Sequence, residues 1–340
     1  MKSHLLLPAT LLFVTVVGRA QETPLGRVIN TLKERIVLSG YAQTGYTWDE
    51  TASSNTFDIK RLIFMANGRI TDRWSCSFMY DFASSGNLLE VYSEYRLLPA
   101  LTVRVGQFKT YFSAENPLSP CVTELIGCYS QAVSYLAGVN GSDPLYGAHG
   151  GRDMGLLVYG TLLNHRFTYH LGLMNGQGIN RRDLNRRKDL VGSLLIHPAK
   201  WASVGGSFIL GRGTAVAASA VNPTIGVGQE YRRNRWAVSG ILKTKPVDVR
   251  AELLGGVDGQ VHSRGHYLSA TLRTFPKFDV VVSYDYFNRN TARGEAQTNY
   301  IAGVQYHFYP LCRLQAQYLY CRPKTAGGSS RIETQLQIRF

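Results

Sequence analysis

The sequence lacks the long apolar runs and the helical periodicity that define helical membrane proteins and all-α domains. After residue 17, the most apolar stretch, Met154 to Leu163, has about half of the 18–20 residues that a membrane-spanning helix needs. Only residues 24–38 are compatible with a short amphipathic helix. The chain beyond its N-terminal segment is therefore expected to consist of strands.

Enzyme and cofactor motifs are also missing. There is no G-x-S-x-G nucleophile elbow, no Walker loop and no G-x-G-x-x-G turn that opens a helix. His262 and His266 are four residues apart, but in a strand this spacing does not build the helical metal-binding face. We therefore expect no catalytic residue, no metal site and no cofactor.

The five cysteines are too few and too scattered for a dense disulfide framework. Cys121 and Cys128 lie in one irregular stretch and could pair in an oxidising compartment, although free thiols fit equally well. Cys312 and Cys321 bound one alternating segment, so that as strand ends they would lie about 30 Å apart, too far for a disulfide.

The N-terminus has the pattern of a secretory signal peptide. Lys2 supplies a positive charge, Leu5 to Val17 is apolar, and Gly18 to Ala20 offers small residues for cleavage. We expect residues 1–20 to be removed and residues 21–35 to form a short periplasmic segment.

What the sequence does contain is apolar–polar alternation, which continues to its last residue. Between Arg331 and Phe340, apolar residues and Thr334 form one face, and Arg, Glu and Gln form the other. The same period of two is found in segments such as 74–82, 247–253, 278–286, 300–308 and 313–321. Alternation of this kind predicts strands with one apolar and one polar face.

Segment length and turn spacing favour a membrane barrel over a soluble sandwich. The segments run to about 9–12 residues, as tilted bilayer crossings do, and aromatics such as Tyr300 and Phe308 lie at the ends of apolar faces. Short turns, such as 70–73 and 98–100, alternate with longer loops, such as 176–188 and 211–223. This rhythm is typical of outer-membrane barrels.

We therefore predict an all-β, transmembrane antiparallel β-barrel over residues 36–340. The segments number about seventeen, but a single-chain bacterial barrel has an even number of strands, and sixteen fits the length. The division of 236–255 stays open, since one long bulged strand would fit as well as two strands. Residues 110–151 form the one very long connection, which we expect to fold into the lumen as a constriction loop.

The formal net charge of +14 is carried partly by the predicted inner faces. Basic residues expected there are Arg61, Arg104, Arg166, Arg250, Arg313 and Arg331. A cationic interior concentrates anions. Basic loops, such as 181–187, could equally bind anionic lipopolysaccharide, and nucleic acid is a poor partner for an exported barrel.

Several fragments resemble the family of phosphate-selective porins O and P. They are "FDIKRLIFMANGRITDRWSCSFMYDF" (57–82), "VRVGQFKTYFSAENPLSP" (103–120), "GRDMGLLVYG" (151–160) and "YHLGLMNGQGIN" (169–180). The resemblance implies a trimeric barrel of sixteen strands with a basic, phosphate-binding constriction. By motif position it assigns Lys60, Arg61 and Lys109 to that constriction, whereas Arg104 is added from strand periodicity alone.

Lys60 and Arg61 are adjacent, so both can face the lumen only near its rim or at a β-bulge. The loop carries Glu115 and Glu124 and few basic residues, which favours a broad anion preference as much as a strict phosphate preference.

The predicted function is a passive outer-membrane porin of a Gram-negative bacterium, for small hydrophilic solutes and preferentially anions such as phosphate. Expected partners are two further copies of the chain, outer-membrane lipid and lipopolysaccharide, and the assembly machinery that recognises a C-terminal aromatic residue such as Phe340. The alternatives are a barrel enzyme of the lipase or protease type and a barrel that binds solutes without conducting them.

Overall fold

The computed structural model describes residues 34–83, 87–139, 143–147 and 149–340. The predicted signal peptide, 1–20, and the predicted periplasmic segment up to residue 33 lie outside the described residues.

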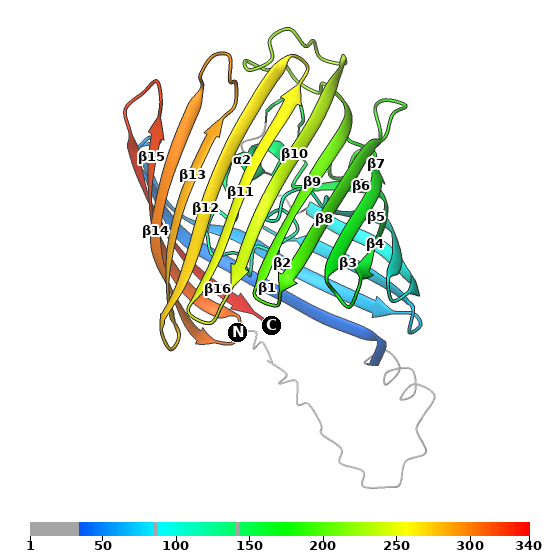
Figure 1. The fold of residues 1–340 in the computed structure, drawn as a ribbon. Coiled ribbons are helices and arrows are strands. Elements are labelled where there is room, and N and C mark those ends of the chain that lie inside the picture. The colour runs from blue at the N-terminus through cyan, green and yellow to red at the C-terminus, as the bar shows by residue number, and fades with distance from the viewer. Residues whose placement is uncertain (1–33, 84–86, 140–142, 148) are drawn as a thin grey trace, which may run out of the picture.

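Sixteen antiparallel strands form one closed barrel, in which each strand pairs with its sequence neighbours and β1 pairs with β16 (Figure 1). The elements are β1 Ile36–Asp49, β2 Ser54–Arg69, β3 Trp74–Asp81, β4 Asn87–Leu98, β5 Leu101–Lys109, α2 Gln131–Leu136, β6 Arg152–Leu162, β7 Phe167–Met174, β8 Asp189–Ala199, β9 Ala202–Thr214, β10 Glu230–Lys243, β11 Val247–Asp258, β12 Val261–Phe275, β13 Phe278–Asn288, β14 Ala296–Tyr309, β15 Cys312–Pro323 and β16 Ser329–Arg339.

The predicted strand count is confirmed, and the ambiguous segment 236–255 is divided between two strands. β10 ends at Lys243 and β11 begins at Val247. The two strands pair in continuous register from Arg233 opposite Asp258 to Lys243 opposite Asp248. The alternative of one long bulged strand is therefore wrong.

The strands expose their apolar faces and bury their polar faces. On β15, Leu314 and Tyr318 are 49% and 46% exposed, whereas Gln315 and Gln317 are 3% and 5% exposed. A soluble sandwich shows the opposite arrangement, with apolar side chains between its layers. The structure therefore has the face distribution of a barrel that is surrounded by lipid.

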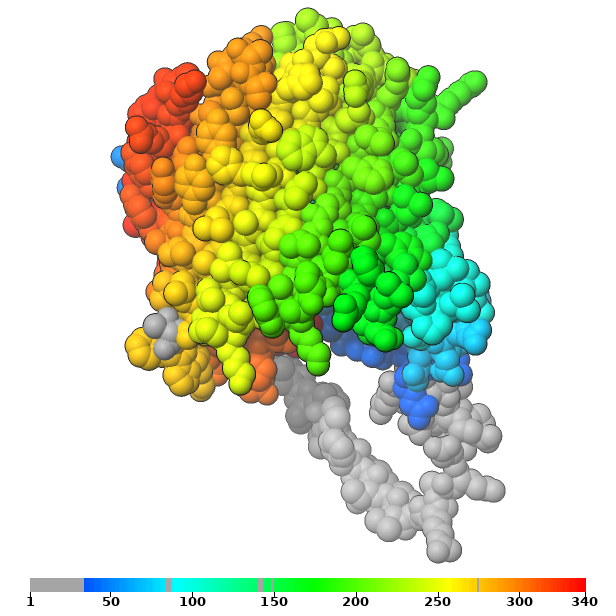
Figure 2. Space-filling view, viewed as in Figure 1, coloured from blue at the N-terminus to red at the C-terminus, as the bar shows by residue number. Residues whose placement is uncertain are grey.

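The connections differ in length at the two ends of the barrel. Those at the end where the chain terminates are short, and the long loops extend from the opposite end (Figure 1). The short turns comprise residues 70–73, 99–100, 163–166, 200–201, 244–246, 276–277 and 310–311. On the side viewed in Figure 2, side chains of neighbouring strands form a continuous outer surface. Within the described residues, no helix has the length and apolar character needed to span a bilayer.

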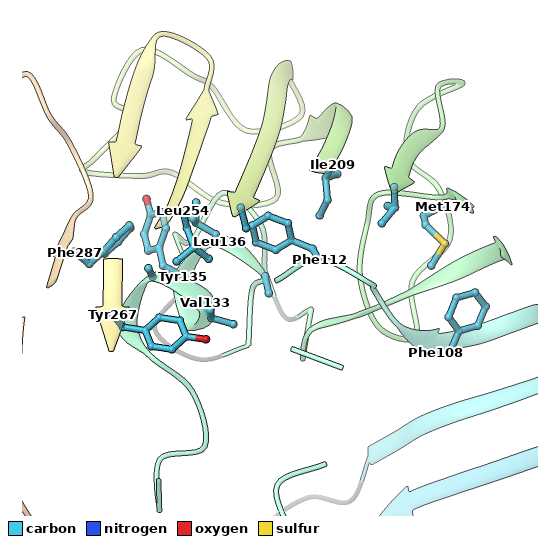
Figure 3. Close-up of a cluster of buried hydrophobic side chains, with 14 of the residues drawn as sticks. Phe108, Phe112, Val133, Tyr135, Leu136, Met174, Ile209, Leu254, Tyr267 and Phe287 are labelled. Carbon is cyan, nitrogen blue, oxygen red and sulfur yellow. The ribbon is translucent and has the colours of Figure 1, made fainter. Parts of the chain in front are cut away.

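A large apolar cluster lies inside the barrel, between α2 and the inner faces of β5 to β13. Figure 3 shows Val133, Tyr135 and Leu136 of α2 near Leu254 and Tyr267 of the wall. The other buried members are Phe108, Phe112, Ala132, Ala137, Leu157, Met174, Val191, Ile209, Ala237 and Phe287. Part of the inner wall is thus apolar, and it packs against the loop that connects β5 to β6.

The last residue of the chain closes the barrel against β1. The backbone N–H of Gly40 donates to the carbonyl of Phe340 at 3.0 Å, and Phe340 N–H donates back at the same distance. A Cβ added at Gly40 would lie 2.4 Å from the Ile63 carbonyl oxygen and 2.6 Å from Cζ of Phe340. Glycine at this position therefore allows the terminal aromatic ring to lie against the first strand.

We expect Gly40→Val to destabilise the folded barrel by about 1–3 kcal/mol, because the side chain would displace both the Phe340 ring and the backbone of β2. Gly240→Val is the matched control, since nothing lies within 4 Å of a Cβ added to this strand glycine. Urea unfolding in lipid vesicles measures both variants. Equal stabilities of the two variants would contradict the role given to Gly40.

Candidate functional site

Residues 110–130 cross the inside of the barrel and bind the polar faces of distant strands. The Ser113 hydroxyl donates to Glu252 of β11 at 2.6 Å. Gln337 of β16 donates to the Cys121 carbonyl at 3.0 Å. Because both partners are buried on the inner faces of their strands, this part of the chain lies inside the barrel rather than above its rim.

Glutamine side chains anchor the same loop to β15. The Ile126 N–H donates to Gln317 Oε1 at 2.9 Å, and Gln317 Nε2 donates to the Glu124 carbonyl at 2.8 Å. Gln315 donates to the same carbonyl at 3.1 Å. The amide groups thus satisfy loop backbone that would otherwise be buried without partners. Here the polar inner face binds the loop instead of lining a water-filled lumen.

Four side chains form a continuous hydrogen-bonded chain across the seam where β1 meets β16; we call it the seam chain. Arg61 Nη1 donates to Gln43 Oε1 at 2.9 Å, and Gln43 Nε2 donates to Gln337 Oε1 at 2.8 Å. Gln337 Oε1 also accepts from Arg313 Nη2 at 3.3 Å. Two guanidinium groups are therefore joined through two neutral amides.

Neither guanidinium of the seam chain has a carboxylate within salt-bridge distance among the described residues. Arg313 is 5% exposed, and its other acceptors are the Gln305 amide at 2.9 Å and the Thr123 carbonyl at 2.7 Å. Buried charges in proteins are ordinarily paired. The seam chain therefore carries two positive charges that are not directly paired with a carboxylate.

The adjacent cations Lys60 and Arg61 face the interior together because β2 contains a bulge. Arg61 pairs with Gln43, but the next residue of β1, Thr44, pairs with Ile59, so Lys60 is the extra residue. Lys60 Nζ donates to the Thr47 hydroxyl at 3.2 Å. The sequence allowed either a position near the rim or a β-bulge, and the structure contains the β-bulge.

Lys109 is inside the barrel but is not free to bind a solute. It is 8% exposed, and its Nζ donates to the Asn116 carbonyl at 2.9 Å, to the Tyr129 hydroxyl at 2.8 Å and to the Leu118 carbonyl. An ammonium group has three hydrogens, and these three acceptors can use all of them. Lys109 thus anchors the β5–β6 loop by hydrogen bonds, a role that its position in the family motif did not predict.

Arg104 is neutralised by an acid and enclosed by aromatic rings. Its Nη2 lies 2.8 Å from Glu94 Oε2, which also accepts from the Tyr159 hydroxyl at 2.8 Å. Its guanidinium carbon lies 4.1 Å from the centroid of the Tyr92 ring. Periodicity correctly placed Arg104 on the inner face, but the pair it forms adds no net positive charge.

Further along the loop, buried carboxylates surround Arg250 of β11. Arg250 Nη2 lies 2.6 Å from Glu124 Oε2, and its Nη1 lies 3.7 Å from Glu115 Oε1. The Ser130 N–H donates to the other oxygen of Glu115 at 2.8 Å. Burial raises the pKa of Glu115 to about 8, against the opposing effect of Arg250. Glu115 is therefore mostly protonated at neutral pH.

The cysteines form no disulfide: all five are free thiols, and Cys121, Cys128 and Cys312 are buried. Of the two states left open for Cys121 and Cys128, the structure has the reduced one.

Sequence reasoning placed Arg313 and Gln337 on inner faces but singled out neither, and it missed Gln43. The alternation of 331–340 did indicate that Gln337 faces inward. No local pattern identifies its partners, because they come from β1, β15 and the loop.

The family model of the phosphate-selective porins O and P matches residues 31–125. This match covers β1 to β5 and the first part of the loop, and it supports the resemblance over that part of the chain. No curated protein matches the chain.

Solved outer-membrane structures share the fold at low sequence identity. OmpT of Vibrio cholerae, described as a trimer form, is 13% identical with a TM-score of 0.64, over 90% of this chain and 99% of that one. The outer-membrane channel DcaP of Acinetobacter baumannii is 13% identical, with a TM-score of 0.64, over 90% and 97%. The anion-selective porin from Comamonas acidovorans is 12% identical, with a TM-score of 0.64, over 89% and 98%.

We expect Lys109→Met to loosen the loop rather than to change ion selectivity. The substitution keeps the apolar stem but removes the donor to the buried Asn116 carbonyl, at a cost of about 1–3 kcal/mol. The Leu118 carbonyl keeps the Tyr129 hydroxyl as a donor. Limited proteolysis within residues 110–151 should become faster than in the unmodified protein. An unchanged cleavage rate together with a large change in ion selectivity would contradict the anchoring role.

The raised pKa of Glu115 predicts a pH dependence of stability. Its folded pKa, about 8, exceeds the ordinary value of 4.5, so the folded state holds a proton that the unfolded state releases. This contribution to the free energy of unfolding is complete below pH 4.5 and is lost as the pH rises through 8. Glu115→Gln should therefore make the free energy of unfolding less dependent on pH between these two values. Parallel pH profiles for both proteins would show that Glu115 does not titrate in this way.

Proposed function

We propose that the chain is a porin of the Gram-negative outer membrane, a passive diffusion channel for small hydrophilic solutes that prefers anions such as phosphate. The observation that carries this proposal is the pair of guanidinium groups in the seam chain, Arg61 and Arg313, which have no carboxylate partner. They lie on the polar inner side of a closed barrel whose outer side is apolar. Unneutralised positive charge in a narrow passage attracts anions and repels cations.

The proposed route passes residues 118–129, which we take to form the constriction. A cavity of about 900 Å³ lies on the side of the short turns, lined by Arg250, Arg313 and Gln337. A cavity of about 310 Å³ lies on the side of the long loops, lined by Gln131 and other residues of the loop and of β13 to β16. Loop residues form part of both walls, so a solute that moves from one cavity to the other must pass them.

Charge pairing favours a moderate anion preference over a strict phosphate filter. Six buried or half-buried arginines have a carboxylate within 3.0 Å. They are Arg104, Arg152, Arg233, Arg235, Arg250 and Arg331. The inner cations without a carboxylate partner include Arg61 and Arg313 of the seam chain and Lys109, whose ammonium group is hydrogen-bonded to the loop.

The remaining expectations belong to the same proposal. A homotrimer follows from the resemblance and is supported by the trimer form described for the Vibrio OmpT structure. The exposed arginines of the β7–β8 loop, among them Arg182 and Arg186, suit the anionic sugars of lipopolysaccharide. We further propose that residues 1–20 are cleaved on export and that the assembly machinery recognises Phe340. The proposal describes a channel rather than an enzyme.

A barrel that binds solutes without conducting them is the second candidate. The observation in its favour is that residues 113–131 are tied to β1, β11, β13, β15 and β16 by hydrogen bonds to buried side chains. Single-channel recording in a planar bilayer separates the two candidates, because only the porin gives discrete conductance steps.

Removal of the seam charge should reduce anion selectivity. In a salt gradient, we expect the reversal potential of the unmodified protein to have the sign that indicates anion preference. For Arg61→Gln the reversal potential should shift toward zero, because one positive charge without a carboxylate partner is lost.

The matched control is the double variant Arg104→Gln with Glu94→Gln, which removes an inner guanidinium without changing the net charge. Cation preference in the unmodified protein, or equal shifts for the single variant and the control, would overturn the assignment of selectivity to Arg61.

A further inference from the structure

The cavity of about 900 Å³ at the short-turn end has two chemically different walls. Its size falls within the roughly 300–1,000 Å³ range of small-molecule sites. Loop residues supply one wall and the inner faces of the strands, chiefly β10 to β15, supply the other. We call it the lower cavity.

The loop wall of the lower cavity is apolar apart from Glu124, which is paired with Arg250. Leu118 and Val122 both line it, and Val122 is 51% exposed although it lies on a segment enclosed by the barrel. An apolar side chain that faces an enclosed polar space gains by contact with another apolar group, at about 25 cal/mol per Å² of area removed from water. This wall therefore provides a contact surface for the apolar part of a ligand.

The strand wall carries the positive charge. Arg250 and Arg273 are paired with Glu124 and Asp248, whereas Arg313 has only neutral acceptors. Arg313 Nε is buried without a hydrogen-bond partner, so that one guanidinium donor is unused.

The charged and apolar walls meet at one place. Arg313 Nη2 donates to the carbonyl of Thr123, the residue that follows Val122, at 2.7 Å. His307, which also lines the cavity, is the cross-strand neighbour of Arg313. Its Nε2 lies 2.8 Å from Asp279. Lys243 and Lys277 also line the cavity, but Arg313 is the cation that is hydrogen-bonded to the loop beside Val122.

We propose that the lower cavity binds small organic carboxylates, with the apolar body against Leu118 and Val122 and the carboxylate on the Arg313 side. This inference deepens the proposed function, because it names a class of solute for the anion-preferring channel. Inorganic phosphate and acetate offer the charge but almost no apolar area. A compact ligand that carries both should occupy the cavity more tightly than either.

Three probes separate the two contributions in calorimetric titrations of the full-length refolded protein in detergent. Benzoate has both the ring and the charge, acetate has the charge alone, and benzamide has the ring without the charge. We expect benzoate to bind at least tenfold more tightly than acetate or benzamide, which corresponds to about 1.4 kcal/mol per comparison. Equal binding of benzoate and acetate, or of benzoate and benzamide, would overturn the proposal.

Substitutions on the two walls test whether benzoate binds in the lower cavity. Val122→Ser should reduce the benzoate affinity about fivefold or more and leave acetate unchanged. Val227→Ser is the matched control, because Val227 is 66% exposed on the β9–β10 loop, away from this cavity. Arg313→Gln should weaken benzoate and leave benzamide unaltered. Should Arg313→Gln fail to fold, as judged by electrophoretic mobility without heating, Val122→Ser and the benzamide comparison still decide the question.

Failure of this inference can be distinguished from failure of the porin proposal. Anion-selective conductance without a benzoate preference would overturn the site in the lower cavity and leave the channel intact. Benzoate binding that is sensitive to Val122→Ser, without conductance, would retain the site and replace the channel with a binding barrel. A benzoate affinity unchanged by Val122→Ser would overturn the assignment to this cavity.

Discussion

An unpaired backbone amide costs several kcal/mol in hydrocarbon, where no water can replace the missing hydrogen bond. Pairing of β1 with β16 from Tyr41–Arg339 to Asp49–Arg331 removes the last exposed row of such groups. Closure also fixes the faces of every strand, because side chains alternate with a period of two. Once the apolar faces lie outside, the glutamines and arginines are enclosed. They must then find hydrogen-bond partners inside the barrel, and the β5–β6 loop supplies them.

The enclosed loop explains why this interior is only partly polar. Apolar residues on the inner faces of β11 to β13, such as Leu254 and Phe287, cover one side of α2. Amide side chains on β1, β15 and β16, such as Gln317 and Gln337, bind the loop backbone on the other side. The loop thus lies between an apolar and a polar half of the wall. Arg61 and Arg313, which have no carboxylate partner among the described residues, belong to the polar half.

Period-two alternation was sufficient to predict the strands and their two faces, because it depends only on neighbouring residues. The closed barrel also required segment length and turn spacing. Alternation also placed Arg61 and Arg104 inside. It did not predict that Lys109 would be fully hydrogen-bonded by the loop, that Glu94 would neutralise Arg104, or that Gln43 and Gln337 would join two guanidinium groups. Each of these contacts depends on where a long irregular segment lies, or on residues far apart in sequence. The adjacent pair Lys60–Arg61 is the exception, since its spacing required a local irregularity that the structure contains.

The bulge at Lys60 has a consequence for how such a barrel can change by insertion and deletion. One residue inserted into a regular strand turns every later side chain to the opposite face, which would expose arginines to lipid and enclose leucines. A bulge absorbs the insertion at a single position: Ile59 still pairs with Thr44 and Arg61 with Gln43. The bulge thus places one more cation in the interior, and deletion of Lys60 would leave both faces of β2 unchanged. Bulges are thus positions at which the charge of a barrel interior can vary while the barrel itself is conserved.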